Sequence, residues 1–151
     1  MRIILQRVLQ AAVFVNRSTI AQIETGLLVF IGVSRQDTTA DANFLSDKIL
    51  GLRVFEDDTG RLNRNVAEAG GAILIVSQFS LYADCRRGRR PSFDGAAPAE
   101  VAEPMYEYFV EKVRGGLVPV KTGKFRADMK VQLTNDGPIT ILLDSEDLNR
   151  G

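Results

Sequence analysis

The run Ala72–Leu81 restricts the possible folds of this chain more than any other feature. It is a near-continuous series of apolar residues and lacks the polar alternation of a strand that is exposed on one side. Such a strand is typical of the centre of a sheet that is covered on both faces. The sequence therefore predicts a sheet with this run as its core strand.

Other segments predict further strands and two helices. Runs rich in Val, Ile and Leu predict strands at Arg2–Val15, Ile20–Val33, Arg53–Phe55, Leu117–Val120, Met129–Leu133 and Ile139–Leu143, with a turn at Asn16-Arg17-Ser18. Helical spacing predicts amphipathic helices over Thr38–Leu52 and Pro98–Val113, the second with an apolar face of Val101, Met105, Tyr108, Phe109 and Val113. Because strands outnumber helices without strict alternation, we expect an α+β domain over residues 1–151, with two main helices on a curved mixed or antiparallel sheet.

The composition excludes several kinds of site. The chain has no histidine and one cysteine, Cys85, which excludes Ser–His and Cys–His dyads and any multi-cysteine metal centre. The carboxylates Asp57, Asp58 and Asp128 lack ligand spacing, so we expect neither a metal nor an organic cofactor. A net charge of zero gives no global attraction to nucleic acid, and no apolar run reaches the roughly 20 residues of a membrane span. We expect a soluble, cytoplasmic protein.

The residues Ser77-Gln78-Phe79-Ser80, at the end of the core run, are the first candidate site. If the strand continues through them, its two-residue period places Gln78 and Ser80 on one face and Ser77 and Phe79 on the other. Two polar side chains then emerge together beside a cleft. The same pattern fits a strand that merely reaches solvent, and it specifies no reaction by itself.

A loop with four arginines in five positions is the second candidate: Arg86, Arg87, Arg89 and Arg90 flank Gly88. Guanidinium groups suit bidentate binding of phosphate, so the loop is a candidate contact for an RNA backbone. The alternative is a solvated loop whose charges pair with nearby acids.

The segment Asn135-Asp136-Gly137-Pro138 lies between the last two predicted strands. Asp-Gly favours tight turns, and proline is tolerated at the start of an edge strand. The plain interpretation is therefore a hairpin turn.

Five segments together resemble the D-aminoacyl-tRNA deacylase family, in order and in spacing along essentially the whole chain. They are Leu5-Gln6-Arg7-Val8, Ser77-Gln78-Phe79-Ser80-Leu81-Tyr82-Ala83, Gly88-Arg89-Arg90-Pro91-Ser92-Phe93, Ala127-Asp128-Met129-Lys130-Val131 and Asn135-Asp136-Gly137-Pro138-Ile139-Thr140. The resemblance implies a barrel-like sheet with two main helices. It also implies a homodimer that hydrolyses the ester between a D-amino acid, or glycine mischarged on tRNA(Ala), and the 3′ end of tRNA while rejecting L-aminoacyl-tRNA.

The resemblance also assigns roles to particular residues. It implies that Gly137 and Pro138 are joined by a cis peptide bond, enter the partner's pocket and exclude L side chains. Ser77, Gln78, Phe79 and Ser80 line the reaction centre, with serine at position 80 where the family usually has threonine. Arg7 braces the Gly-Pro segment, and Phe125 and Met129 lie near the terminal adenosine. The ribose 2′-hydroxyl assists water, which explains how catalysis proceeds without histidine.

Three other hypotheses remain open at this stage. A serine hydrolase would form an acyl intermediate on Ser80, although the sequence offers it no histidine base. A non-enzymatic nucleic-acid-binding module would use the arginine loop. A sister deacylase would edit L-threonyl-tRNA, and the chirality of the accepted amino acid distinguishes it.

Overall fold

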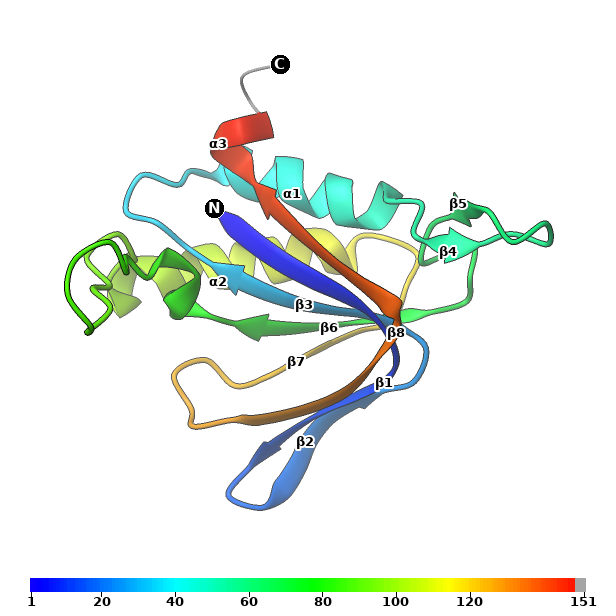
Figure 1. Ribbon diagram of the computed structural model, residues 1–151, viewed down its shortest axis with the longest axis horizontal. Coiled ribbons are helices and arrows are strands. Elements are labelled where there is room, and N and C mark those ends of the chain that lie inside the picture. Colours follow the sequence, from blue (N-terminus) through cyan, green and yellow to red (C-terminus); the bar gives the residue numbers. More distant parts are fainter. Residues whose placement is uncertain (149–151) are drawn as a thin grey trace.

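The computed structural model describes residues 1–148, which form a strongly curved mixed sheet with two long helices on one of its faces (Figure 1). The strands of the six-stranded sheet are β1 (Arg2–Val15), β2 (Ser18–Ile23), β3 (Gly26–Gly32), β6 (Ala72–Ser77), β7 (Val120–Thr122) and β8 (Lys130–Asp144). The helices are α1 (Thr39–Gly51), α2 (Ala99–Arg114) and the short α3 (Ser145–Leu148), and a 3₁₀ turn, η1, spans Phe79–Tyr82. A separate hairpin consists of β4 (Phe55–Glu56) and β5 (Leu62–Arg64). The expected α+β class is confirmed.

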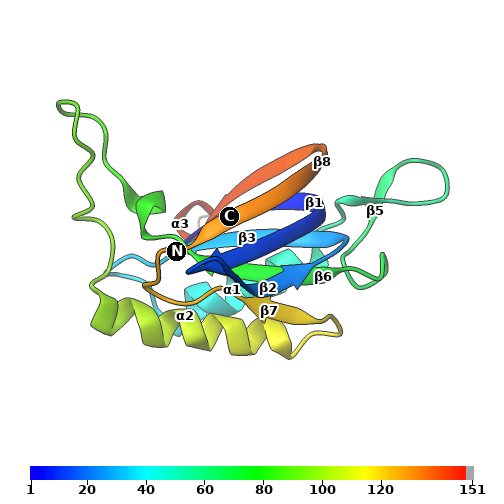
Figure 2. The ribbon, with the colours of Figure 1, turned by 90° about the horizontal axis from the view of Figure 1, so that it is seen from below.

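The strand order is β2-β1-β3-β6-β7, and β8 pairs with β1 on its other side. The long β1 bends so that its first half pairs with β3 and its second half with β2, both antiparallel. Strands β3, β6 and β7 run parallel to one another. The sheet curls until β2 and β7 lie close together, which gives the nearly closed, barrel-like shape seen in Figure 2.

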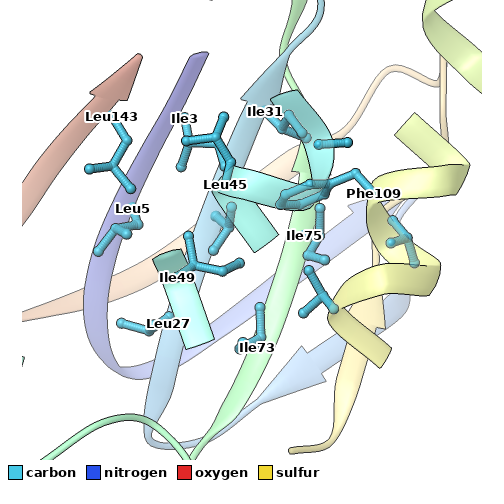
Figure 3. Close-up of a cluster of buried hydrophobic side chains, with 14 of the residues drawn as sticks. Ile3, Leu5, Leu27, Ile31, Leu45, Ile49, Ile73, Ile75, Phe109 and Leu143 are labelled. Carbon is cyan, nitrogen blue, oxygen red and sulfur yellow. The ribbon is translucent and has the colours of Figure 1, made fainter. Parts of the chain in front are cut away.

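The central strands are buried on both faces, as the apolar run predicts. Alternate residues of β3 and β6 point toward α1 and α2, where Leu27, Ile73 and Ile75 join a core with Leu45 and Phe109 (Figure 3). The residues between them point into the barrel and pack with residues of β1 and β2 in a second core, formed by Val8, Ala11, Val13, Ala21, Ile23, Leu28, Leu74 and Val76. Because side chains alternate between the two faces of a strand, each of these strands contributes residues to both cores.

Strand β8 corrects the prediction of a hairpin at Asn135–Pro138. Both predicted strands pair with the same partner, β1, so the chain continues as one 15-residue strand instead of reversing. The register steps from Val8 opposite Asn135 to Gln6 opposite Thr140, which leaves the four residues 136–139 opposite Arg7 alone. The turn residues form a wide bulge in an edge strand, called the Arg7 bulge below.

Several other boundaries also differ from those expected. The run Ile20–Val33 is divided into β2 and β3 by a bend at Glu24 and Thr25. The core strand ends at Ser77, and η1 follows it. Both long helices are confirmed, with Thr38 capping α1 through a capping box with Asp41. Val101 is 48% exposed and lies outside the apolar face of α2. Phe109 and Val113 are buried on that face as predicted, together with Tyr106 and Val110, and Met105 and Tyr108 are partly buried against the core.

Candidate active site

A pocket of about 700 Å³ opens at the carboxyl ends of the three parallel strands. Its walls come from residues that follow β3, β6 and β7 and from the first turn of α2. Ligands of sheets with parallel strands commonly bind at this edge, because the connections that leave the strands diverge there. The volume is that of an ordinary small-molecule site.

The pocket brings together five of the predicted site residues: Ser77, Gln78, Phe79, Phe125 and Met129. Gln78 leaves the strand geometry, with φ −145° and ψ 82°, so the expected alternation through Ser80 is wrong. Gln78 and Ser80 are nevertheless neighbours, because the 3₁₀ turn folds the chain back and the amide Nε2 of Gln78 donates to the hydroxyl of Ser80. Ser80 is not among the residues that line the pocket. Its hydroxyl is hydrogen-bonded to Gln78, which does line the pocket.

Main-chain hydrogen bonds hold this segment in place. The amide of Gln78 donates to the carbonyl of Ile31 at 2.7 Å, and the amide of Leu81 donates to the carbonyl of Gln78 at 3.2 Å. Phe79 is 60% exposed and meets Phe93 edge to face, with ring centroids 4.9 Å apart. The segment therefore presents an exposed aromatic pair at the edge of the pocket.

Phe125 and Met129 form the opposite wall, on the connection between β7 and β8. The ring of Phe125 lies 5.5 Å from that of Tyr106, and the hydroxyl of Tyr106 donates to the carbonyl of Ile75 at 3.3 Å. Burial raises the pKa of Tyr106 to about 12, so this hydroxyl stays protonated at neutral pH. It acts as a structural donor, and the wall is largely apolar.

The Arg7 bulge lies outside this pocket. Gly137 and Pro138 are exposed, their peptide bond is cis as the resemblance implies, and neither lines the pocket. Arg7 is only 6% exposed, and its guanidinium donates to the carbonyl of Val54 at 2.8 Å and to that of Asp136 at 3.1 Å. The predicted bracing contact is therefore present, although the predicted site is divided between two regions of the chain.

The arginine loop projects away from the sheet (Figure 2). Its base is closed by paired main-chain bonds between Asp84 and Ser92, at 2.7 and 2.9 Å. The guanidinium of Arg86 binds the Asp84 carboxylate at 2.7 Å and lowers the pKa of Asp84 to about 2. Arg87, Arg89 and Arg90 are exposed. Of the four arginines, Arg86 thus has a local acidic partner.

Sequence reasoning missed two basic residues of the pocket, Arg35 and Arg126. Isolated arginines in loops form no pattern, so only the fold reveals that they share a cavity.

Among the acids, Asp57 is structural: the Thr59 hydroxyl, together with the amides of Thr59 and Arg61, lowers the pKa of Asp57 to about 2. Within residues 1–148, no cluster of three or more potential metal ligands occurs. No helix in the same range is long and apolar enough to span a membrane.

Comparisons with known proteins identify the family of this chain. The family model described as D-Tyr-tRNA(Tyr) deacylase matches residues 4–144. The D-aminoacyl-tRNA deacylase of Solibacter usitatus is 57% identical over 150 residues, covering 99% of each chain. That of Thermotoga petrophila is 53% identical over 148 residues, covering 98% of this chain and 99% of the relative.

A solved structure described as "c-Myc DNA Unwinding Element Binding Protein" has a TM-score of 0.90 and 40% identity over 95% of this chain and 98% of that one. The residues matched by the family model include both the Ser77–Ser80 segment and the Arg7 bulge. The chain therefore belongs to the D-Tyr-tRNA(Tyr) deacylase family.

Proposed function

We propose that this protein is an editing hydrolase that cleaves the ester of D-aminoacyl-tRNA and releases free tRNA and the amino acid. The match to the family over almost the whole chain, with Ser77, Gln78 and Phe79 lining a pocket, is the observation that carries this proposal. The cytoplasm is the proposed compartment, because charged tRNA is used there.

The proposed reaction uses the substrate's own ribose. Water, assisted by the 2′-hydroxyl, attacks the ester carbonyl, and the tetrahedral intermediate collapses as the bond to the 3′-oxygen breaks. The 3′-oxygen takes up a proton, which leaves the ribose hydroxyl and the free amino acid. The amides of Phe79 and Ser80 begin a 3₁₀ turn, where first-turn N–H groups have no acceptor within the helix. They are suitable donors to the oxyanion, and the protein supplies positioning in place of a histidine base.

Rejection of L-amino acids is assigned to Gly137 and Pro138 of a second copy of the chain. Both residues are exposed on β8, an edge strand that pairs only with β1 among the described strands, and neither reaches the pocket of its own chain. Leu142, on the same edge strand, is 64% exposed. An exposed edge with apolar side chains is suited to association. A homodimer would therefore supply the part of the site that each pocket lacks, and glycine, without a side chain, would escape this exclusion.

Contacts to tRNA are assigned to two surfaces. Phe125 and Met129 offer an apolar wall for the terminal adenosine, and the exposed Phe79 ring gives a face on which a base can stack. The arginine loop is assigned to backbone phosphates, through Arg87, Arg89 and Arg90, with Arg86 already paired to Asp84.

The decisive experiment compares the release of D-Tyr and of L-Tyr from tRNA by the purified protein. We expect rapid hydrolysis of the D-ester alone, and slow hydrolysis of D-aminoacyl-tRNA that lacks the terminal 2′-hydroxyl. Preferential release of L-threonine would identify the sister editing activity. Normal cleavage of the 2′-deoxy substrate would refute the proposed mechanism but not the activity.

A second candidate function, binding of nucleic acid without hydrolysis, is favoured by the DNA-binding description of the similar solved structure and by the exposed arginines. It predicts affinity for DNA or RNA together with no release of either enantiomer. The same hydrolysis assay, joined to a binding measurement on uncharged tRNA and duplex DNA, separates the two functions.

A further inference from the structure

Arg126 has a backbone conformation that is unfavourable for arginine. It is the third residue of a turn closed by the amide of Ala127, which donates to the carbonyl of Lys124 at 3.2 Å. Its φ is 65°, in the left-handed region that glycine usually supplies at this place in a turn. Residues held in such conformations concentrate at binding sites. Because glycine would suit this backbone better, we ask whether the arginine side chain has a role in binding.

That side chain is exposed and lines the pocket, together with Arg35 from the connection between β3 and α1. Within residues 1–148, no carboxylate lies at salt-bridge distance from either guanidinium. Arg35 makes one contact, from its Nε to the carbonyl of Asp94 at 3.3 Å. Among the described lining residues Asp128 is the only acid, and Lys130 binds it at 2.9 Å. The pocket thus carries two positive charges that are not neutralised.

The start of α2 adds to the same positive field. Pro98 and Ala99 line the pocket at the start of this 16-residue helix, and no side chain caps it. Glu100, the acid of the first turn, is not among the residues that line the pocket. The N-terminus of a helix carries a partial positive charge and favours anions. Together with the two guanidinium groups, it makes this pocket suitable for an anionic ligand.

The chemistry of the proposed substrate identifies which anion this is. In aminoacyl-tRNA the amino acid's carboxyl group is esterified and its amino group is cationic, so the reacting end has no negative charge. The nearest anion is the phosphodiester on the 5′ side of the terminal adenosine. Arg126 directly follows Phe125, one of the two residues assigned to that adenosine. We propose that Arg126 and Arg35 bind this phosphate, an inference that rests on the proposed function and extends it.

The test uses a stable analogue in which D-tyrosine is joined by an amide to 3′-amino-3′-deoxyadenosine, with or without a 5′-phosphate. We expect the phosphate to tighten binding to the wild-type protein about tenfold or more, as for a hydrogen bond between charged groups, when both affinities are measured by calorimetry. Arg126→Gly should reduce this factor, which is the ratio of the two affinities within the same variant, to less than about threefold. Arg35→Gln should reduce it in part.

Two controls make the result specific. Arg126→Gly suits the left-handed conformation, so its melting temperature should not fall, and disappearance of the phosphate effect cannot then be attributed to unfolding. Arg114→Ala removes an arginine at the opposite end of α2, where it pairs with Glu111, and should leave the phosphate factor unchanged.

The outcomes separate this inference from the function on which it rests. If the unphosphorylated analogue binds but the phosphate adds nothing, or adds as much in Arg126→Gly as in the wild type, the phosphate subsite is refuted while the deacylase proposal stands. If neither analogue binds to the wild-type protein, both proposals fail.

Discussion

The Ser77–Ser80 segment and the Arg7 bulge, the two regions assigned to the reaction, are held in the fold by different means. Main-chain bonds fix the first, in particular the bond from the Gln78 amide to the carbonyl of Ile31. Side chains hold the second. The buried guanidinium of Arg7 joins the carbonyls of Asp136 and Val54, and the Asn135 side chain accepts a hydrogen bond from the amide of Ile139 at 2.9 Å. Loss of a side chain should therefore disturb the bulge far more than the segment. The following predictions test this difference.

Arg7→Met should have the largest effect. Arg7 is 6% exposed and its guanidinium donates to two carbonyls, so its removal leaves the buried carbonyl of Val54 and the partly buried carbonyl of Asp136 without this donor. We expect the free energy of unfolding to fall by about 2–4 kcal/mol, and selectivity for D- over L-aminoacyl-tRNA to weaken as the bulge loosens. Urea denaturation at fixed protein concentration and the paired hydrolysis assay measure the two effects.

Arg61→Met is the matched control for this prediction. Arg61 is exposed in the β4–β5 hairpin, so its substitution should change the unfolding free energy by no more than about 0.5 kcal/mol. Equal losses in the two variants would show that Arg7 does not brace the bulge.

Gly137→Ala should have the next largest effect. The φ of Gly137 is 125°, and an added Cβ would lie 3.0 Å from Nη2 of Arg7 and 3.1 Å from Cγ1 of Ile139. We expect a loss of about 1–3 kcal/mol in unfolding free energy, with a reduced preference for the D-substrate. Gly88→Ala, in the arginine loop, is the comparison: its φ is 66° but a Cβ there meets nothing within 4 Å. If Gly88→Ala proves equally destabilising, conformation alone and not the contact with Arg7 restricts position 137.

The sequence predicts the two regions unequally. The apolar run correctly locates the central strand, because burial on both faces leaves a direct trace in composition. The Asp136-Gly137-Pro138 signal is the same for a hairpin as for a bulge, and Arg7, the residue opposite the bulge, lies 129 positions away from Asp136. No local pattern contains that contact. The family resemblance anticipated it, whereas turn chemistry did not.

The residues of the pocket could likewise be predicted only in part from the sequence. Four residues at the end of β6 are too few to distinguish continued strand from a 3₁₀ turn, so the predicted alternation of Gln78 and Ser80 failed although the two side chains do meet. Arg35 and Arg126 lie 91 positions apart and become neighbours in one cavity only because β3 and β7 run parallel, on either side of β6. Sheet topology is needed to find them.

Neutralising Arg87 and Arg89 should have a smaller effect, confined to affinity for tRNA. Removing each arginine that binds a phosphate should lower the slope of log affinity against log salt by about 0.7 to 0.9. The selectivity for D- over L-aminoacyl-tRNA should not change. Arg86→Ala should lower the slope less, because its guanidinium already binds the Asp84 carboxylate at 2.7 Å. Titration of uncharged tRNA at several salt concentrations measures all three substitutions. An unchanged slope in the double variant would mean that the loop is solvated charge.

Ser80→Ala should have the smallest effect of all. The hydroxyl accepts a hydrogen bond from Gln78, but the position of the segment depends on main-chain bonds that alanine retains. In the proposed mechanism water attacks with help from the ribose, so no step requires the serine oxygen. We therefore expect kcat/KM to fall less than about tenfold, against the roughly 10⁶-fold loss that follows removal of a true nucleophile. Mass spectrometry during turnover of the wild-type enzyme provides the independent check. A loss near the larger figure, together with an aminoacyl adduct on Ser80, would replace the ribose-assisted route by covalent catalysis and would make the segment, not the bulge, the region most sensitive to a single side chain.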